Sequence, residues 1–134
     1  MMSDRVGDFI IRLQNASAVG QRSVSLPHSR HLEAIARKLK EFGFLASVAV
    51  ESKEGVEAKK TLVVAPAYRD RGVPKIRGVK RLSKPGRRLY VGHAGAHAVA
   101  SGTGVRLLST PSGVLSDREA RRSKVGGESL FEIW

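Results

Sequence analysis

The chain contains no cysteine and few aromatic residues. Without cysteine it can form neither a disulfide framework nor a thiolate metal site, and such a composition suits a reducing compartment. Aromatic residues are 5% of the 134 residues, so we expect a core of Val, Leu, Ile and Ala. No stretch approaches the ~20 apolar residues of a membrane-spanning helix, and the N-terminus lacks the features of a signal sequence. We therefore expect a soluble, untargeted chain with one modest core or two small ones.

Acidic residues are also scarce. The chain has 24 Lys and Arg against 12 Asp and Glu, a net charge of +12, and this excess favours a polyanionic partner. Residues 1–67 carry ten basic and seven acidic groups, net +3, whereas residues 68–134 carry fourteen and five, net +9. We expect the second half to face the polyanion.

The first half alternates between helical and extended patterns. Apolar residues spaced three and four apart predict helices near 4–18 and 29–42, the second capped by Ser29 and stopped by Gly43. Strands are predicted at 22–27, 44–51 and 60–65, the last two joined by a hairpin around Glu54-Gly55. The result is an α-β-α-β-β unit.

The predicted fold class is α+β, with two small packed halves. The first is an α/β domain over 1–66, and the second is a mostly β domain with short helices over 75–134. Turn formers and charges without periodicity predict a short linker over 67–74.

The segment from Lys75 to Tyr90 is the most basic part of the chain. It has seven cations within positions 75–88 and no acid: Lys75, Arg77, Lys80, Arg81, Lys84, Arg87 and Arg88. A turn at 83–86 predicts that residues 76–82 fold back on 88–91 as a hairpin that presents cations from both arms. Contacts of these cations with phosphates would make binding fall steeply with salt. The alternative is a solubilising surface.

The stretch from Gly104 to Arg121 holds the second candidate site. It predicts a buried strand at 105–108, a polar loop at 109–113 and a helix that starts at a capping box of Ser116 and Glu119. Two hydroxyls and small residues on a braced loop can approach a phosphate, a 2′-hydroxyl or a base edge. Taken alone, the loop favours the interpretation as an ordinary Ser/Gly hairpin turn.

The end of the chain adds further candidates. Basic residues including Arg121 close the short helix, Gly126-Gly127 allows the backbone to approach a ligand, and a final strand is predicted over 130–134. Glu128 could pair with an Arg or accept a hydrogen bond from a base amino group or a 2′-hydroxyl. Tyr90 could stack on a base or fill the core.

No catalytic or metal site is predicted. His93 and His97 are four apart, but a glycine lies between them and no third ligand follows, so a structural role is favoured. Gly102-Thr103-Gly104 lacks the third glycine of a dinucleotide loop. We expect no cofactor and no enzymatic activity.

Three motif blocks resemble the family of the eighth protein of the small ribosomal subunit, of bacterial or organellar type. They are the opening with Asp4, Asp8, Arg12 and Asn15-Ala16; the run from Gly78 to Tyr90; and GVRLLSTPSGVLSDREAR with Gly126-Gly127-Glu128 and Trp134 beyond it. The resemblance covers the chain from about Asp4 to Trp134.

The resemblance implies a structural protein of the ribosome. It would bind the central domain of small-subunit rRNA early in assembly of the platform, beside neighbouring small-subunit proteins, in a bacterial cytoplasm or an organelle. It also implies binding to, and repression of, the mRNA of its own operon.

The RNA-binding residues predicted from the motifs and the charge fall in three groups. They are Lys80, Arg81, Lys84, Arg87, Arg88 and Tyr90; Ser109, Thr110, Ser112 and Gly113; and Arg121, Gly126, Gly127 and Glu128. The basic residues would supply affinity, and the loop, Tyr90 and Glu128 would recognise local shape in an irregular RNA helix. The rival classes are a generic basic DNA-binding or architectural protein and a small phosphate-handling enzyme. The first lacks a basic recognition helix, and the second lacks a convergent site.

Overall fold

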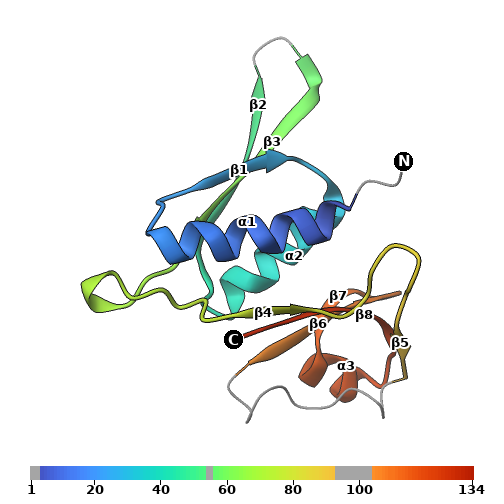
Figure 1. Cartoon of the computed structure of the whole chain (residues 1–134). Helices are drawn as coiled ribbons and strands as arrows, with labels where there is room; N and C mark the ends of the chain where they lie inside the picture. The colour runs from blue at the N-terminus through green and yellow to red at the C-terminus, as the bar shows by residue number, and fades with distance from the viewer. Residues whose placement is uncertain (1–3, 54–55, 93–103) are drawn as a thin grey trace. The chain divides into compact units, whose positions relative to one another are not determined.

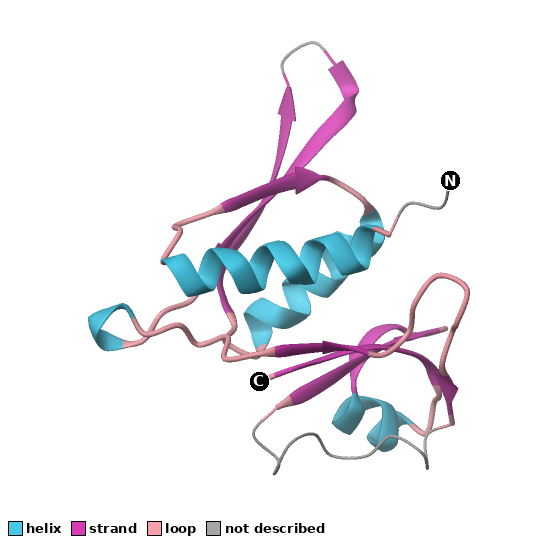
Figure 2. Cartoon of the chain, viewed as in Figure 1, coloured by secondary structure: helices cyan, strands magenta, loops and turns pink. Residues whose placement is uncertain are grey.

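The computed structural model describes residues 4–53, 56–92 and 104–134 (Figures 1 and 2). Contacts between residues divide the chain into two compact units, Phe9–Ile76 and Met1–Asp8 with Arg77–Trp134. The α+β fold class predicted from the sequence is confirmed, including the α-β-α-β-β order of the first half. The domain limits at 66 and 75 stay a prediction.

The first unit contains the amphipathic helix α2 (Arg30–Glu41) and, from Phe9 onward, the amphipathic helix α1 (Arg5–Val19). Their apolar faces supply much of the core of this unit: Phe9, Ile10, Leu13, Ala16, Leu32, Ile35, Ala36 and Leu39 are all buried. Helix α2 has both predicted caps. The Ser29 hydroxyl accepts a hydrogen bond from the Leu32 amide at 3.1 Å, and Gly43 ends the helix with a φ of +87°, which favours glycine.

Strands β1 (Val24–Pro27), β3 (Val56–Pro66) and β2 (Leu45–Lys53) form an antiparallel sheet in that order. Val24, Leu26, Leu62 and Val64 point into the core. Figure 1 shows β2 and β3 extending beyond β1 as a two-stranded ribbon. Both strands are longer than predicted, because backbone pairing continues through the charged sequence after Glu51, where no apolar alternation marks a strand. The tip at Glu54-Gly55 lies outside the described residues.

The second unit is built around β8 (Gly127–Ile133), which has neighbours on both sides. On one side lie β6 (Val105–Thr110) and then β7 (Gly113–Ser116). On the other side, β4 (Val79–Arg81) and β5 (Tyr90–Val91) pair with opposite ends of β8. Helix α3 (Asp117–Ser123) contacts β6 and β7. The core of this unit includes Leu107, Leu108, Ala120, Phe131 and Ile133.

The predicted hairpin between residues 76–82 and 88–91 is wrong. Its two arms contain β4 and β5, which do not pair with each other; β4 pairs with Phe131–Ile133 and β5 with Gly127-Glu128. Only an isolated bridge between Lys84 and Arg87 closes the turn. The turn signal was correct, but β8 lies far along the chain, and turn chemistry cannot report a partner so distant in sequence.

The predicted linker contains a short 3-10 turn, η1 (Asp70–Gly72), and a bridge between Tyr68 and Pro74. The Tyr68 hydroxyl donates to the carbonyl oxygens of Gln21 at 2.6 Å and Ala16 at 3.3 Å. Burial raises the pKa of this tyrosine. The segment is thus attached to the end of α1 within the first unit.

Candidate functional site

The turn between β6 and β7 is shorter than the predicted loop. Ser109 and Thr110 belong to β6 and Gly113 to β7, so only Pro111 and Ser112 lie between the strands. The Thr110 hydroxyl donates to the Gly113 carbonyl at 2.7 Å and accepts from the Ser112 amide at 3.1 Å. Gly113 has a φ of +106°, a conformation that favours glycine. Thr110 therefore shapes the turn from within.

Three predicted site residues form a row across three strands. Glu128 of β8 pairs with Ser109 of β6 on one side and with Tyr90 of β5 on the other. Residues directly opposite each other in antiparallel strands carry side chains on the same face of the sheet. Tyr90 is 71% exposed, so of its two predicted roles the structure excludes filling the core. The row places a hydroxyl, a carboxylate and an exposed aromatic ring on one face.

Two glycines permit this row to form. A Cβ on Gly127 would collide with the Ser109 carbonyl and lie 3.0 Å from the Thr110 Cα, and a Cβ on Gly126 would collide with the backbone at Val91 and Gly92. Side chains at these positions would push the start of β8 away from β6 and from the end of β5. Gly126 and Gly127 were predicted to let the backbone approach a ligand closely. In the structure they allow close approach of the neighbouring backbone.

The Glu128 carboxylate is held by two donors. Its Oε2 accepts from the Ser83 hydroxyl at 2.5 Å and from Arg88 Nη1 at 3.0 Å. The Glu128 side chain is 17% exposed and that of Arg88 is 50% exposed. The ion pair with an arginine was one of the two predicted roles. Ser83 was not among the predicted residues, because a serine before Lys-Pro-Gly carries only a turn signal.

The basic segment lies next to this carboxylate, because Arg88 belongs to it. Lys84 and Arg87 exchange backbone hydrogen bonds of 2.9 Å around a tight turn, in which Gly86 has a φ of +83°. Lys84 and Arg87 therefore lie at the two ends of a hydrogen-bonded turn, and Arg88 follows directly after it. Lys80 lies on β4, opposite Glu132 of β8. Cations in such positions suit contact with phosphates.

All three guanidinium nitrogens of Arg81 are engaged within the protein. Its two terminal nitrogens donate to the Asp4 carboxylate, and its Nε donates to the Ser83 carbonyl at 2.9 Å. Hydrogen bonding to Arg81 is the main cause that lowers the pKa of Asp4. The Asp4 carboxylate also accepts a hydrogen bond from the Gly7 amide. Arg81 therefore has a structural role in this state of the protein.

Arg121 lies in the last turn of helix α3, in the same unit. The predicted capping box is present: the Ser116 hydroxyl accepts from the Glu119 amide, and the Glu119 carboxylate accepts from the Ser116 amide, both at 3.1 Å. Arg121 lies 3.4 Å from the carboxylate of the buried Asp117. Its side chain is 37% exposed, so part of the cation still faces solvent.

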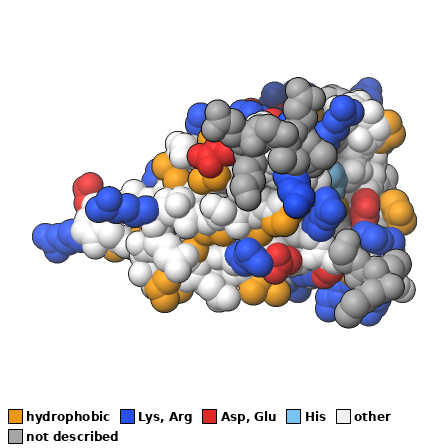
Figure 3. All heavy atoms as spheres, turned by 90° about the horizontal axis from the view of Figure 1, so that it is seen from above, with side chains coloured by type: hydrophobic (Ala, Val, Ile, Leu, Met, Phe, Trp, Pro, Cys, Tyr) orange, Lys and Arg blue, Asp and Glu red, His pale blue; other side chains and the backbone are white. Residues whose placement is uncertain are grey.

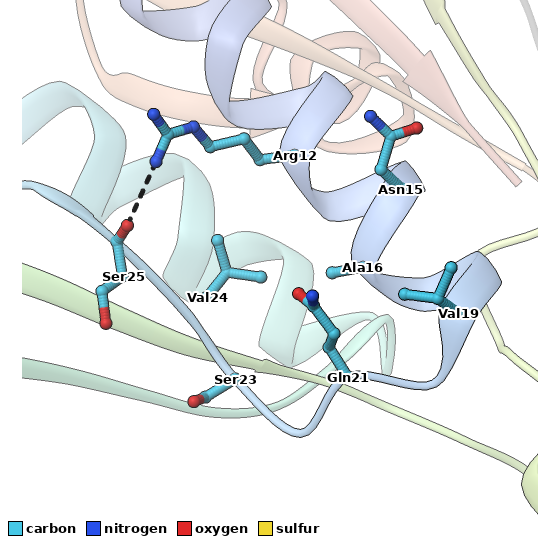
Figure 4. Close-up of a pocket in the computed structure, with 8 residues that line it drawn as sticks. All are labelled: Arg12, Asn15, Ala16, Val19, Gln21, Ser23, Val24 and Ser25. Carbon is cyan, nitrogen blue, oxygen red and sulfur yellow. Dashed lines mark hydrogen bonds between the residues drawn. The ribbon is translucent and has the colours of Figure 1, made fainter.

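A separate hollow lies in the first unit, between α1 and the segment that enters β1 (Figure 4). It is lined by Arg12, Asn15, Ala16, Val19, Gln21, Ser23, Val24 and Ser25. Arg12 donates to the Ser25 carbonyl across it at 3.4 Å. The lining contains no acid and no histidine, so this set of residues offers no general acid or base.

The described residues contain no group of three or more His, Asp or Glu that could hold a metal ion. The pair His93 and His97, like Gly102-Thr103, lies outside them. Within the same residues no helix is both long and apolar enough to cross a membrane. Figure 3 shows Lys and Arg side chains at many places on one face of the molecule, among hydrophobic and uncharged ones.

Comparison with known proteins identifies the chain. The family model described as ribosomal protein S8 matches residues 4–134. A protein of Sorangium cellulosum named small ribosomal subunit protein uS8 is 43% identical over 134 residues, which cover 100% of both chains. Proteins with the same name from Opitutus terrae and Nitratidesulfovibrio vulgaris are 42% identical, over 99% and 100% of this chain and 100% of each relative.

The chain is thus a structural protein of the small ribosomal subunit and not an enzyme. It belongs to the ribosomal protein S8 family. Its partners are those of a ribosomal protein, rRNA and other proteins of the subunit. The resemblance stated from the sequence motifs is confirmed.

Proposed function

We propose that this protein binds the central domain of small-subunit rRNA directly and helps to assemble the platform of the subunit. Ser109, Glu128 and Tyr90 are the residues that recognise the RNA. The observation that carries the proposal is their row across β6, β8 and β5, which brings together three segments distant in sequence. Lys84, Arg87 and Arg88 form a basic turn beside this row, and the contact of Arg88 with Glu128 connects the two.

The chemistry of the row suits an irregular RNA helix. A regular A-form major groove is too narrow for side chains, so sequence-specific proteins contact bases that are unstacked or splayed out. The exposed Tyr90 ring can stack on such a base, and Glu128 and Ser109 can accept from an amino group or a 2′-hydroxyl. The neighbouring cations supply affinity that depends on salt and not on sequence.

The turn between β6 and β7, which Thr110 shapes, and Arg121 complete the proposed interface. The turn presents Ser112 and the backbone of Gly113 at the end of β6 and β7, and Pro111 offers no backbone donor because it lacks an amide proton, so its ring can make only van der Waals contact. We include binding to the protein's own operon mRNA in the proposal, through a hairpin that resembles the rRNA site.

Binding to a panel of RNAs tests the proposal. The purified protein is titrated with hairpins from the central domain, a scrambled RNA, the operon mRNA leader and duplex DNA at two salt concentrations. We expect one rRNA hairpin to be preferred at both concentrations, and the mRNA leader to compete for the same site. Equal binding to all RNAs and to duplex DNA, fading together with salt, would instead establish the generic DNA-binding or architectural alternative.

A further inference from the structure

Ser83 occupies a central place in the candidate site, although no motif assigned it a role in binding. It is 4% exposed and lies just before the basic turn. Its backbone amide donates to the Leu130 carbonyl of β8 at 3.3 Å, which fixes the residue against the central strand. Its hydroxyl points to the Glu128 carboxylate.

The contact with Ser83 leaves one oxygen of Glu128 for a ligand. Oε2 accepts from both Ser83 and Arg88, whereas no hydrogen bond from the described residues reaches Oε1. A hydroxyl-to-carboxylate distance of 2.5 Å belongs to the strong, charge-assisted class of hydrogen bonds. The carboxylate is therefore oriented before any ligand arrives, and binding does not have to supply the entropy of ordering it.

The same hydroxyl also holds the strand that carries Tyr90. Ser83 Oγ accepts from the Leu89 amide at 3.2 Å, and the Leu89 carbonyl accepts from the Ser129 amide at 2.9 Å. These two bonds fix the backbone immediately before Tyr90 against β8. One side chain thus sets both the acceptor and the aromatic ring of the row.

We propose that Ser83 is a positioning residue for RNA recognition: it orients Glu128 so that Oε1 accepts a hydrogen bond from a base amino group or a 2′-hydroxyl, and it fixes Tyr90 beside that acceptor. This inference rests on the proposed function. Ser83 differs in this role from the cations of the basic turn. Ser83 affects which RNA is preferred, whereas the cations affect the overall affinity for phosphates.

A double-mutant cycle tests the inference, with the central-domain hairpin and the scrambled RNA as probes. We expect Ser83→Ala to lower the preference for the hairpin about three- to tenfold, the net value of one hydrogen bond, with affinity for scrambled RNA unchanged. In a Glu128→Gln background the same substitution should have a smaller effect, because the oriented carboxylate is already lost and only the bond from the Leu89 amide to Ser83 remains to be removed.

Ser129→Ala is the matched control. Ser129 is also a buried serine of this unit, 2% exposed, but its hydroxyl has no hydrogen-bond partner among the described residues. It should leave the preference unchanged. Ser83→Cys, which keeps a weak donor of similar shape, should recover part of the preference lost in Ser83→Ala. Thermal unfolding of each variant shows whether the protein is folded at the assay temperature.

The outcomes separate this inference from the proposed function. If the wild type shows no preference among RNAs, the proposed function fails. If the wild type has the preference and Ser83→Ala retains it, only the role of Ser83 is refuted. A loss that is equal for both RNAs, or undiminished in the Glu128→Gln background, would also refute it, since a merely structural serine would behave in that way.

Discussion

Replacement of Thr110 by valine isolates the two hydrogen bonds that shape the β6–β7 turn. Valine keeps the shape of threonine but neither donates to the Gly113 carbonyl nor accepts from the Ser112 amide, bonds of 2.7 and 3.1 Å in the native turn. Both bonds are exposed, so water replaces part of what is lost, and we expect a cost of about 1 kcal/mol in the free energy of the native turn. Binding that requires this turn should weaken about fivefold.

The assay is the affinity for the preferred central-domain hairpin and for scrambled RNA, with Thr110→Ser as the control because it retains the hydroxyl. We expect the serine variant to bind like the wild type, and the valine variant to lose affinity for the hairpin alone. If the serine variant loses affinity and the valine variant retains it, the methyl group matters and not the hydroxyl, and the role of the two hydrogen bonds of Thr110 is refuted.

Three further predictions concern stability. Ser116→Ala removes the N-cap of α3 and should lower the free energy of unfolding by about 1 kcal/mol in urea titrations; an unchanged midpoint would contradict the capping box. Gly127→Ala should cost about 1–3 kcal/mol because its Cβ meets the backbone of β6, whereas Gly92→Ala, which meets nothing within 4 Å, should cost less. Pairing with Arg81 lowers the pKa of Asp4 below 3.8, so the stability that Asp4 contributes is present above that pH and disappears as the pH falls through the lowered value. The stabilities of wild type and Asp4→Asn, measured by denaturant unfolding from pH 7 to pH 2, should therefore converge in acid; a constant difference would contradict the pairing.

Local signals in the sequence predicted the local structure well. The caps of α2 and α3 were predicted because side-chain hydroxyls at helix starts and a glycine at a helix end act within a few residues. The alternating pattern before Pro27 likewise predicted β1. These features depend on neighbours along the chain, which the sequence displays directly.

Contacts between distant residues could not be predicted in the same way. Nothing near Glu128 in the sequence indicates that Ser109 and Tyr90 lie beside it, since strand pairing is decided by burial of the whole sheet. The engagement of Arg81 by Asp4 likewise joins residues 77 positions apart. Charge counting treats Arg81 as one more cation for RNA, whereas its contacts give it a structural role.

We propose that recognition and affinity come from different residues of this protein, and the salt dependence of RNA binding separates the two contributions. The dissociation constants of wild type, Lys84→Ala and Glu128→Gln are measured over a range of salt concentrations with the preferred hairpin and with scrambled RNA. Lys84→Ala should weaken both RNAs alike and reduce the slope of log affinity against log salt by nearly one. Glu128→Gln should lower the preference for the hairpin but leave scrambled RNA bound at least as tightly, because it removes a negative charge from the site. If Lys84→Ala changes the preference and Glu128→Gln does not, this division of roles between the two residues is contradicted.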